Sequence, residues 1–358
     1  MSVAELLGWP AYSSTTAKEM GVAAMTLTFQ RFLSPAGLLS DEDVILPLHN
    51  WQTEGKRTAL VTLIGVEGGA PRQVGAQMAV AEDGSYAGYL SGGCLEQAVV
   101  LEARAVIQTG QNKIVRYGKG SPYFDVKLPC GSGLDLYFDQ SISVDRVADI
   151  LARRARRETC LLETVLATGA SKVSTCGEGC DAAQSVWADG TLHRVYPSRV
   201  RLVLLGHGPG LVGLAVLAAA TGIELRISTS DDATRAELEA SGLSHALSHS
   251  SADEVKGGNL EQLDAATAAV LFFHAHDQEP DLLGAILKSK SFYIGAIGNH
   301  AVHRERLAVL AARGFALADL ERIRAPVGSI PAAKSKATLA IGVLAELMSE
   351  AKALNLVH

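Results

Sequence analysis

Hydrophobic and polar residues follow different patterns before and after Ser198. Up to that residue, stretches that alternate like β-strands are mixed with segments that carry apolar residues at helical spacing. The pattern predicts strands at residues 58–66, 76–89, 134–138, 159–168 and 185–196, and helices at residues 97–107 and 144–157. We therefore predict an α+β domain over residues 41–198. Residues 1–40 form an N-terminal extension that is a candidate for disorder.

After Ser198 the chain alternates strand and helix patterns to its end. A continuous apolar strand at residues 201–205 opens this part, and a last helix is predicted at residues 336–348. Such alternation is typical of a parallel sheet whose strands are joined by crossover helices. The predicted fold class is therefore α/β, with the α+β domain followed by a Rossmann-like doubly wound parallel-sheet domain over residues 199–358.

A glycine-rich loop, GHGPGLVG at residues 206–213, follows the first strand of the second domain and precedes a helix predicted over residues 214–221. Within it, Gly208, Gly210 and Gly213 have a spacing found in dinucleotide sites. Glycines there allow a tight turn and a close approach of the backbone to pyrophosphate. The helix N-terminus would hold the anion.

The second strand of this domain ends without an acidic residue at the expected place. Thr229 occupies the position where a nicotinamide-binding protein holds a carboxylate against the ribose hydroxyls. Three explanations stay open. Asp231 or Asp232 reaches back to the ribose, the ligand is not NAD, or the domain has kept its fold and lost its dinucleotide.

A turn with the sequence SGGCLE, residues 91–96, places Cys94 at the start of a predicted helix. The positive end of the helix dipole and the free N–H groups there favour thiolate over thiol. Cys130 has a similar setting in LPCGSG, residues 128–133. The alternative is that both cysteines are small, inert residues in tight turns.

Three further groups could carry chemistry. His274, His276 and Asp277 follow a predicted strand, but a capped strand end or a substrate-contacting loop explains them better than a metal site. Cys176 and Cys180 lack the partner pair of a zinc site. The segment after residue 298 carries polar and basic groups that could meet an anionic ligand, namely Asn299, His300, His303, Arg304 and Arg306. For Arg304 and Arg306 the alternative is a solvated helix face.

Composition excludes several function classes. The net charge is −6, from 32 basic and 38 acidic residues spread along the chain, so we expect no nucleic-acid partner. No apolar run approaches the roughly twenty residues of a membrane span, and no signal peptide is evident. The five cysteines are odd in number in a long chain, which favours reduced thiols and a cytoplasmic location.

Taken together, several motifs resemble the XdhC/CoxI family, which comprises accessory proteins of molybdenum hydroxylases such as xanthine dehydrogenase. They are GAPR at residues 69–72, the turn at 91–96, PCG at 129–131, the glycine loop and the segment 293–298. The resemblance implies a homodimeric factor that binds molybdenum cofactor (molybdopterin). Such a factor supports the sulfuration of the cofactor, for which a cysteine desulfurase is a possible partner, and delivers it to the apoenzyme.

Carried across, the resemblance assigns candidate cofactor contacts in both domains. Thiolates suit a soft, sulfur-ligated metal centre and arginine suits phosphate. The candidates are Cys94, Cys130, Arg72, Gly92, Gly93, Glu96, Gly208, Gly210 and Gly213. The second domain departs from the family pattern at Leu211, at Thr229, at residues 299–301 and at residues 328–330, which predicts an altered ligand or client enzyme.

The competing hypothesis is an NAD(P)-dependent oxidoreductase that uses the glycine loop. The missing ribose acid at Thr229, and the lack of an obvious Tyr-Lys or His-Asp pair near the sheet's carboxyl edge, favour the accessory protein. We therefore expect a cofactor-binding chaperone without a turnover reaction. A covalent sulfur carrier at Cys94 is a weaker third hypothesis.

Overall fold

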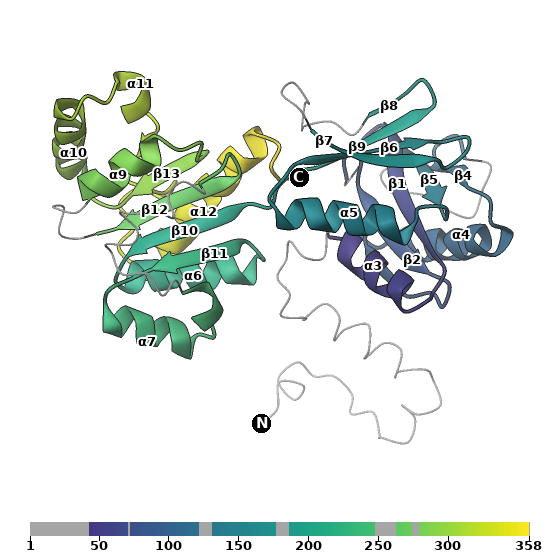
Figure 1. Ribbon diagram of the computed structural model, residues 1–358, viewed down its shortest axis with the longest axis horizontal. Coiled ribbons are helices and arrows are strands. Elements are labelled where there is room, and N and C mark those ends of the chain that lie inside the picture. The colour runs from purple at the N-terminus through teal and green to yellow at the C-terminus, as the bar shows by residue number, and fades with distance from the viewer. Residues whose placement is uncertain are drawn as a thin grey trace, which may run out of the picture.

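The first domain is built on a five-stranded antiparallel sheet (Figure 1). The computed structural model describes residues 43–70, 72–121, 131–176, 186–247, 263–273 and 279–357. The strand order is β3-β2-β1-β5-β4, formed by β1 (Thr58–Glu67), β2 (Gln77–Ala81), β3 (Tyr86–Gly88), β4 (Lys113–Gly118) and β5 (Gly133–Asp139). β2 and β3 form the hairpin expected within residues 76–89. The sequence pattern does not predict β4, because charged residues interrupt its short apolar run.

The two faces of β1 enter different hydrophobic cores. Val61 and Leu63 pack with residues of helix α4 (Glu96–Thr109). Leu60 lies in a separate core with residues of α3 (Ile45–Thr53) and α5 (Val144–Ala155). Successive side chains of a strand point to opposite faces, so this sheet is buried on both sides.

A four-stranded antiparallel sheet joins the core that contains α3 and α5. Its order is β7-β6-β9-β8, formed by β6 (Cys160–Val165), β7 (Ser171–Thr175), β8 (Val186–Ala188) and β9 (Thr191–Tyr196). Cys160 of β6 and Tyr196 of β9 contribute buried side chains to that core. Asp189 and Gly190 form the β8–β9 turn, and their positive φ angles of 51° and 76° are those of a two-residue hairpin loop.

The second domain is a parallel five-stranded sheet with helices on both faces, which confirms the predicted fold class. Its strand order is β11-β10-β12-β13-β14. The strands are β10 (Arg201–Gly206), β11 (Glu224–Ser228), β12 (Thr267–Phe272), β13 (Tyr293–Ala296) and β14 (Ile323–Arg324). Its described helices are α6 (Pro209–Ala220), α7 (Asp232–Ala240), α9 (Glu279–Leu287), α10 (His300–Ala312), α11 (Leu317–Leu320) and α12 (Lys336–Ala353), with a short 3-10 helix at Ser244–Ala246.

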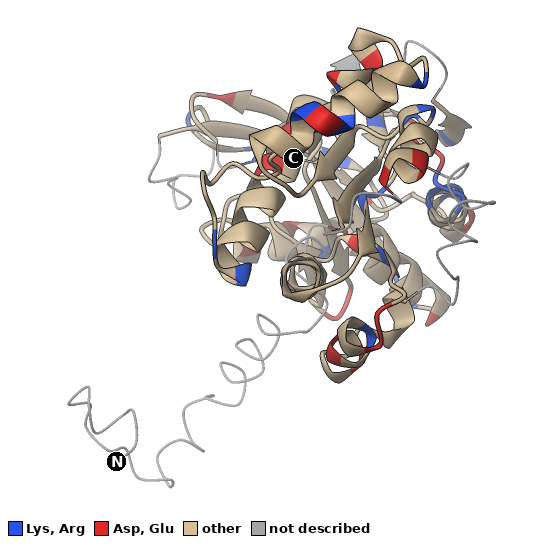
Figure 2. Ribbon diagram, turned by 90° about the vertical axis from the view of Figure 1, so that its left-hand side faces the viewer, with Lys and Arg blue, Asp and Glu red and all other residues tan. Residues whose placement is uncertain are grey.

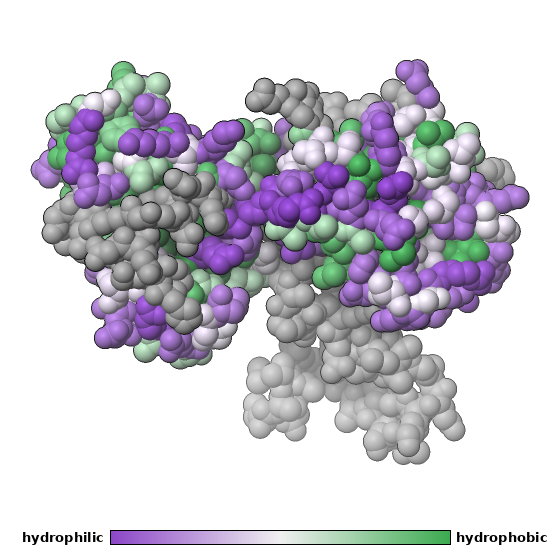
Figure 3. All heavy atoms as spheres, viewed as in Figure 1, coloured by the Kyte–Doolittle hydropathy of each residue, from purple (hydrophilic) through white to green (hydrophobic). Residues whose placement is uncertain are grey.

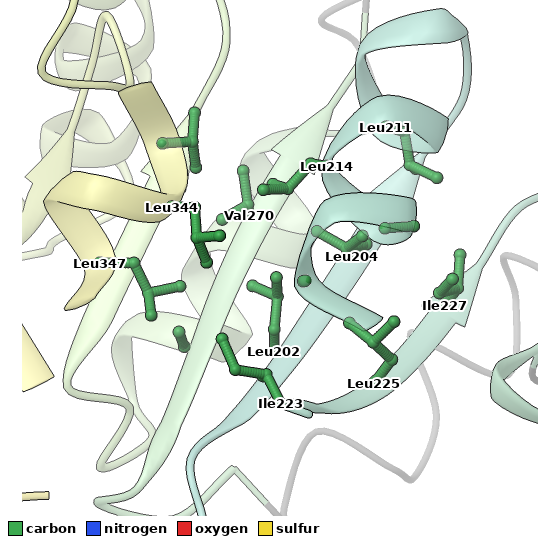
Figure 4. Close-up of a cluster of buried hydrophobic side chains, with 14 of the residues drawn as sticks. Leu202, Leu204, Leu211, Leu214, Ile223, Leu225, Ile227, Val270, Leu344 and Leu347 are labelled. Carbon is green, nitrogen blue, oxygen red and sulfur yellow. The ribbon is translucent and has the colours of Figure 1, made fainter. Parts of the chain in front are cut away.

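Each face of the parallel sheet has its own core. Leu202 and Leu204 of β10 pack with residues of α6 and α12, including Leu214 and Leu347 (Figure 4). Leu205, on the opposite face of the same strand, packs with residues of α9 and α10. The two cores hold the strand ends, and therefore the loops that follow them, in fixed positions.

Helix α6 begins earlier than the sequence pattern indicates. The helix predicted from residue 214 starts at Pro209, because Gly208 serves as its N-cap and proline at the first helical position has its φ already set. The true loop is therefore residues 206–208. Gly210 and Gly213 lie inside the helix.

Strand β10 pairs with β11 on one side and with β12 on the other, which makes the carboxyl ends of β10 and β12 a topological switch point. Gly206 ends β10 with a φ of 119°, and a Cβ placed there would lie 2.2 Å from the Phe272 carbonyl oxygen. Only glycine fits this close approach. Ligands of such sheets bind in the crevice at this edge.

The two domains are joined at the opposite, amino edge of the parallel sheet. Arg157, just after α5, donates to Asp264 at 2.5 Å and to Glu224 at 2.8 Å. Glu224 begins β11, and Asp264 lies three residues before β12. Arg201, the first residue of β10, also donates to Glu224. Figures 1 and 3 show this junction, where hydrophilic side chains gather.

Basic and acidic side chains are interspersed over the described elements (Figure 2). No described helix is long and apolar enough to cross a membrane. The absence of a nucleic-acid partner and the cytoplasmic location stay predictions.

Candidate functional site

Cys94 lies on an exposed turn directly before helix α4. Leu95 is the N-cap residue and Glu96 the first helical residue, so the predicted position of the thiol at a helix start is found in the structure. Gly92 and Gly93 have φ angles of 76° and 113°, and a Cβ on either would meet no described atom within 4 Å. The glycines therefore allow this backbone conformation, and no described atom fills the space next to them.

The carboxylate of Glu96 holds this turn in shape. Its Oε1 accepts from the N–H groups of Leu90 at 3.0 Å and Ser91 at 2.8 Å. Its Oε2 accepts from Ser91 Oγ at 2.9 Å, from the N–H of Gly93 at 2.8 Å and from that of Leu95 at 3.2 Å. Glu96 is only 5% exposed. The side chain is a structural clasp for the loop that carries Cys94.

Burial alone would raise the pKa of Glu96, but the hydrogen bonds from Ser91 and Leu90 outweigh it and lower the pKa. The carboxylate is therefore ionised at neutral pH. The Glu96 carboxylate accepts hydrogen bonds from the N–H groups of the turn, so these groups are not free to bind an external anion. An anionic ligand beside Cys94 therefore needs a positively charged side chain nearby.

Arg72 supplies such a group. It donates to the Tyr89 hydroxyl at 3.0 Å, and its Cζ lies 4.5 Å from the centre of the Tyr89 ring. Tyr89 is two residues before the turn, so the predicted pair of Arg72 and Cys94 is brought to the same region. The neighbouring residue Pro71 lies outside the described residues.

Arg194 of β9 is a further basic residue in this region that the motifs do not single out. Burial lowers its pKa, and the positive charges of Arg154 and Arg72 lower it further, whereas Tyr196 acts in the opposite direction. Its Cζ lies 5.0 Å from the Tyr196 ring. The sequence does not single out Arg194, because it lies in a strand without any motif. The fold of the four-stranded sheet brings it towards Arg72.

Several other candidates are not placed or are inert. Cys130, Cys180, His274, His276 and Asp277 lie outside the described residues. Cys160 is fully buried, and this burial raises the pKa of its thiol to about 11, so it is a core residue. Among the described residues, no group of three or more His, Cys, Asp or Glu side chains could hold a metal ion.

In the glycine loop, the Gly208 N–H donates to Thr234 Oγ1 at 2.9 Å. The Thr234 hydroxyl donates in turn to Asp231 Oδ2 at 2.6 Å. In a dinucleotide site the Gly208 N–H would bind a phosphate, but here the Thr234 hydroxyl near the start of α7 already accepts from it.

The other two glycines of the predicted motif have packing partners. A Cβ on Gly210 would lie 3.0 Å from Leu339 Cδ2 and 3.1 Å from Phe272 Cε1. A Cβ on Gly213 would lie 3.3 Å from the Lys336 carbonyl oxygen. Both glycines let α6 approach α12 closely, which is a structural reason for their presence. Their role in ligand binding stays a prediction.

The end of β11 does not present a carboxylate to a ribose. Thr229 is buried, and its hydroxyl accepts from the N–H of Asp231. The Asp231 side chain caps α7 by accepting from the Thr234 N–H, and its bonds with the hydroxyl and N–H of Thr234 lower the pKa of Asp231. The structure gives no support to a nicotinamide cofactor.

The segment at the start of α10 divides into two groups. Arg304 is exposed, as expected for a solvated helix face. Arg306 is 4% exposed and forms an ion pair with Glu279, so the expectation that it could line a solvated face is wrong. Its partner is 27 residues distant in sequence, which explains why the pattern does not reveal the pair.

The Cys94 turn and the glycine loop lie in different parts of the molecule. The first domain attaches at the amino edge of the parallel sheet through Arg157, whereas the glycine loop lies at the carboxyl edge. β10 has six residues, and at roughly 3.3 Å per residue the two edges are about 20 Å apart. One chain therefore does not bring the two predicted halves of the site together.

Comparison with known proteins agrees with this two-part architecture. Family models for the XdhC and CoxI family and for the XdhC Rossmann domain match residues 51–118 and 202–347. The Escherichia coli (strain K12) protein named molybdenum cofactor insertion chaperone PaoD is 34% identical over 295 residues, covering 82% of this chain and 84% of PaoD. A second protein of that strain, the uncharacterized YqeB, is 25% identical over 81% of this chain, which spans only 43% of YqeB.

A solved structure from Bacillus halodurans, described as a xanthine dehydrogenase, superposes with a TM-score of 0.67. The match covers 86% of this chain and 96% of that one at 19% identity, and it supports the fold alone. With family matches in both domains and 34% identity to PaoD over most of both chains, the chain belongs to the XdhC and CoxI family.

Proposed function

We propose that this protein is an accessory factor that binds molybdenum cofactor and delivers it to a molybdenum hydroxylase of the xanthine dehydrogenase type. The observation that carries the proposal is the exposed Cys94 thiol, on an open turn that Glu96 clasps and Arg72 flanks. A thiolate suits a soft molybdenum centre, and a guanidinium suits a phosphate. The relationship to a protein named as a molybdenum cofactor insertion chaperone supports the same conclusion.

Each group of the turn has a separate task in this proposal. Cys94 contacts the metal end of the cofactor, and Arg72 contacts its pterin or phosphate. Glu96 fixes the backbone and does not touch the cofactor, because its oxygens are occupied by the turn itself. Cys130 is the second candidate thiol. The cofactor is cargo, so no turnover reaction is required.

The cofactor would receive its terminal sulfido ligand while it is held here, with a cysteine desulfurase as the sulfur source and the cytoplasm as the location. A protein that shields the cofactor at a solvent-facing turn must still admit the sulfur donor. The open space beside Gly92 and Gly93 is compatible with such access.

A homodimer would resolve the separation of the two candidate half-sites. If two copies associate about a two-fold axis, the Cys94 turn of each copy can face the carboxyl edge of the parallel sheet of the other. Two inactive variants, Cys94→Ala and Gly208→Val, should then restore about half of the cofactor retention when they are co-expressed as differently tagged chains. Absence of any complementation would exclude a site shared between copies.

The direct test is to purify the protein from a host that makes the cofactor and to measure molybdenum and pterin per chain. Parent protein should retain both, Cys94→Ala and Cys130→Ala should lose them, and Cys160→Ala should behave as the parent because its thiol is buried in the core. Equal retention by Cys94→Ala and parent would remove Cys94 from the site. A parent protein that carries neither molybdenum nor pterin would contradict the proposed function.

A further inference from the structure

The start of helix α10 lies at the carboxyl edge of the parallel sheet, directly after β13. Asn299 caps this helix, since its Oδ1 accepts from the N–H groups of Ala301 at 2.9 Å and Val302 at 3.0 Å. Any anion at this helix start must therefore be held mainly by side chains, because the cap already occupies these two N–H groups.

Arg306 provides a buried positive charge beneath the turn that leads into α10. Its Nε and Nη2 donate to Glu279, at 3.2 Å for Nε and 3.0 Å for Nη2 to either oxygen, and Nη2 also donates to the Ile297 carbonyl at 2.8 Å. The side chain is 2% exposed and that of Glu279 is 1% exposed. A helical side chain extends towards the helix N-terminus, which places this guanidinium near the capped start.

The third nitrogen of this guanidinium is not used by the described part of the protein. Nη1 is buried and has no hydrogen-bond partner among the described residues. In a planar guanidinium, Nη1 lies away from the edge formed by Nε and Nη2, which faces Glu279. Two N–H donors of this buried guanidinium therefore have no acceptor among the described residues, and a bound ligand could supply one.

His303 lies one turn before Arg306 and also has a buried nitrogen without a partner. Its Nδ1 is buried and has no hydrogen-bond partner in the described structure. Burial lowers the pKa of His303, and the charges of Arg306 and His300 lower it further. His300, His303 and Arg306 are spaced three residues apart, so they share one face of α10, with Glu279 of α9 as the neighbouring acid.

We propose that this face of α10, formed by His300, His303 and Arg306, binds a phosphate group. A phosphate offers several acceptor oxygens and negative charge, which match the unused N–H donors of Arg306 and the two histidines on the same helix face. The site lies at the edge of the sheet where ligands of such folds bind. This assignment extends the proposed function, because the site would hold the phosphate end of the cofactor. It rests on that proposal only for the identity of the ligand.

The test uses the full chain and two simple probes, inorganic phosphate and inorganic pyrophosphate. Calorimetric titration should show binding by the parent, and NMR of the histidine ring should show that saturation raises the pKa of His303. His303→Gln should weaken binding about tenfold. Arg306→Lys keeps a positive charge for Glu279 but removes Nη1, and it should also weaken binding about tenfold. Arg304→Gln, which removes an exposed charge from the same helix, should change affinity less than twofold.

Two outcomes would overturn the assignment. One is no binding of either probe at millimolar concentration, and the other is equal weakening by His303→Gln and Arg304→Gln, which would reduce the effect to general surface charge. A nucleoside diphosphate and purified molybdopterin, titrated in parallel, distinguish the source of the phosphate. If the parent retains no molybdopterin but His303 still responds to pyrophosphate, the phosphate site stands and the proposed function fails.

Discussion

The clasp formed by Glu96 makes a quantitative prediction about the turn that carries Cys94. In Glu96→Gln one carboxylate oxygen becomes an NH₂ group. Oε1 accepts two hydrogen bonds and Oε2 accepts three, so either orientation of the amide sets the NH₂ against at least two donors. Hydrogen bonds to a charged group contribute about 1.5 to 3 kcal/mol each, so we expect the free energy of unfolding to fall by at least about 3 kcal/mol.

The measurement is urea-induced unfolding at pH 7, with cofactor retention measured on the same samples. Glu102→Gln is the matched control, because Glu102 lies on the same helix and its ion pair with Lys113 is at the surface, where such pairs contribute about 0 to 1 kcal/mol. Glu96→Gln should also lower cofactor retention while Cys94 is unchanged. A loss of stability no larger than that of Glu102→Gln would refute the role of Glu96.

The pH dependence provides a second check on the same clasp. The pKa of Glu96 in the folded protein lies below its usual value of 4.5. Its ionisation therefore stabilises the fold above about pH 4.5, and this contribution is lost as the pH falls through the lowered pKa. The stability difference between parent and Glu96→Gln should be full at pH 7 and shrink at pH values below 4.5. A difference that does not change with pH would contradict the charge-based explanation.

Three other predictions concern the second domain and the junction. Gly210→Val should lower the free energy of unfolding by about 1 to 3 kcal/mol, because its side chain would overlap Phe272. Thermal unfolding measures this loss of stability, and ligand binding is then compared at a temperature where the variant is still folded. Arg157→Ala should speed limited proteolysis between the domains through loss of its bonds to Asp264, whereas Arg156→Ala should not. Purified protein should show no substrate-dependent oxidation of NADH or NADPH; robust oxidation would favour the oxidoreductase hypothesis.

The sequence by itself determined the fold class and the position of the thiol turn. Alternating polarity and turn residues such as Asp189-Gly190 act over a few neighbouring residues, so hairpins and the start of α4 are visible in the chain. The alternation of strands and helices after Ser198 likewise determines a parallel sheet, because each crossover helix must cover a face of that sheet. Local patterns of this kind need no knowledge of distant partners.

Only the tertiary structure decided which candidate residues share a site. Glu96 has the same local pattern whether it contacts a cofactor or clasps its own turn, and its burial and five hydrogen bonds distinguish the two. Arg306 and Glu279 meet because two crossover helices begin at the same sheet edge, and Arg157 fixes the first domain to the opposite edge. These outcomes depend on side chains far apart in sequence, whose meeting is set by the packing of the sheets and not by any pattern along the chain.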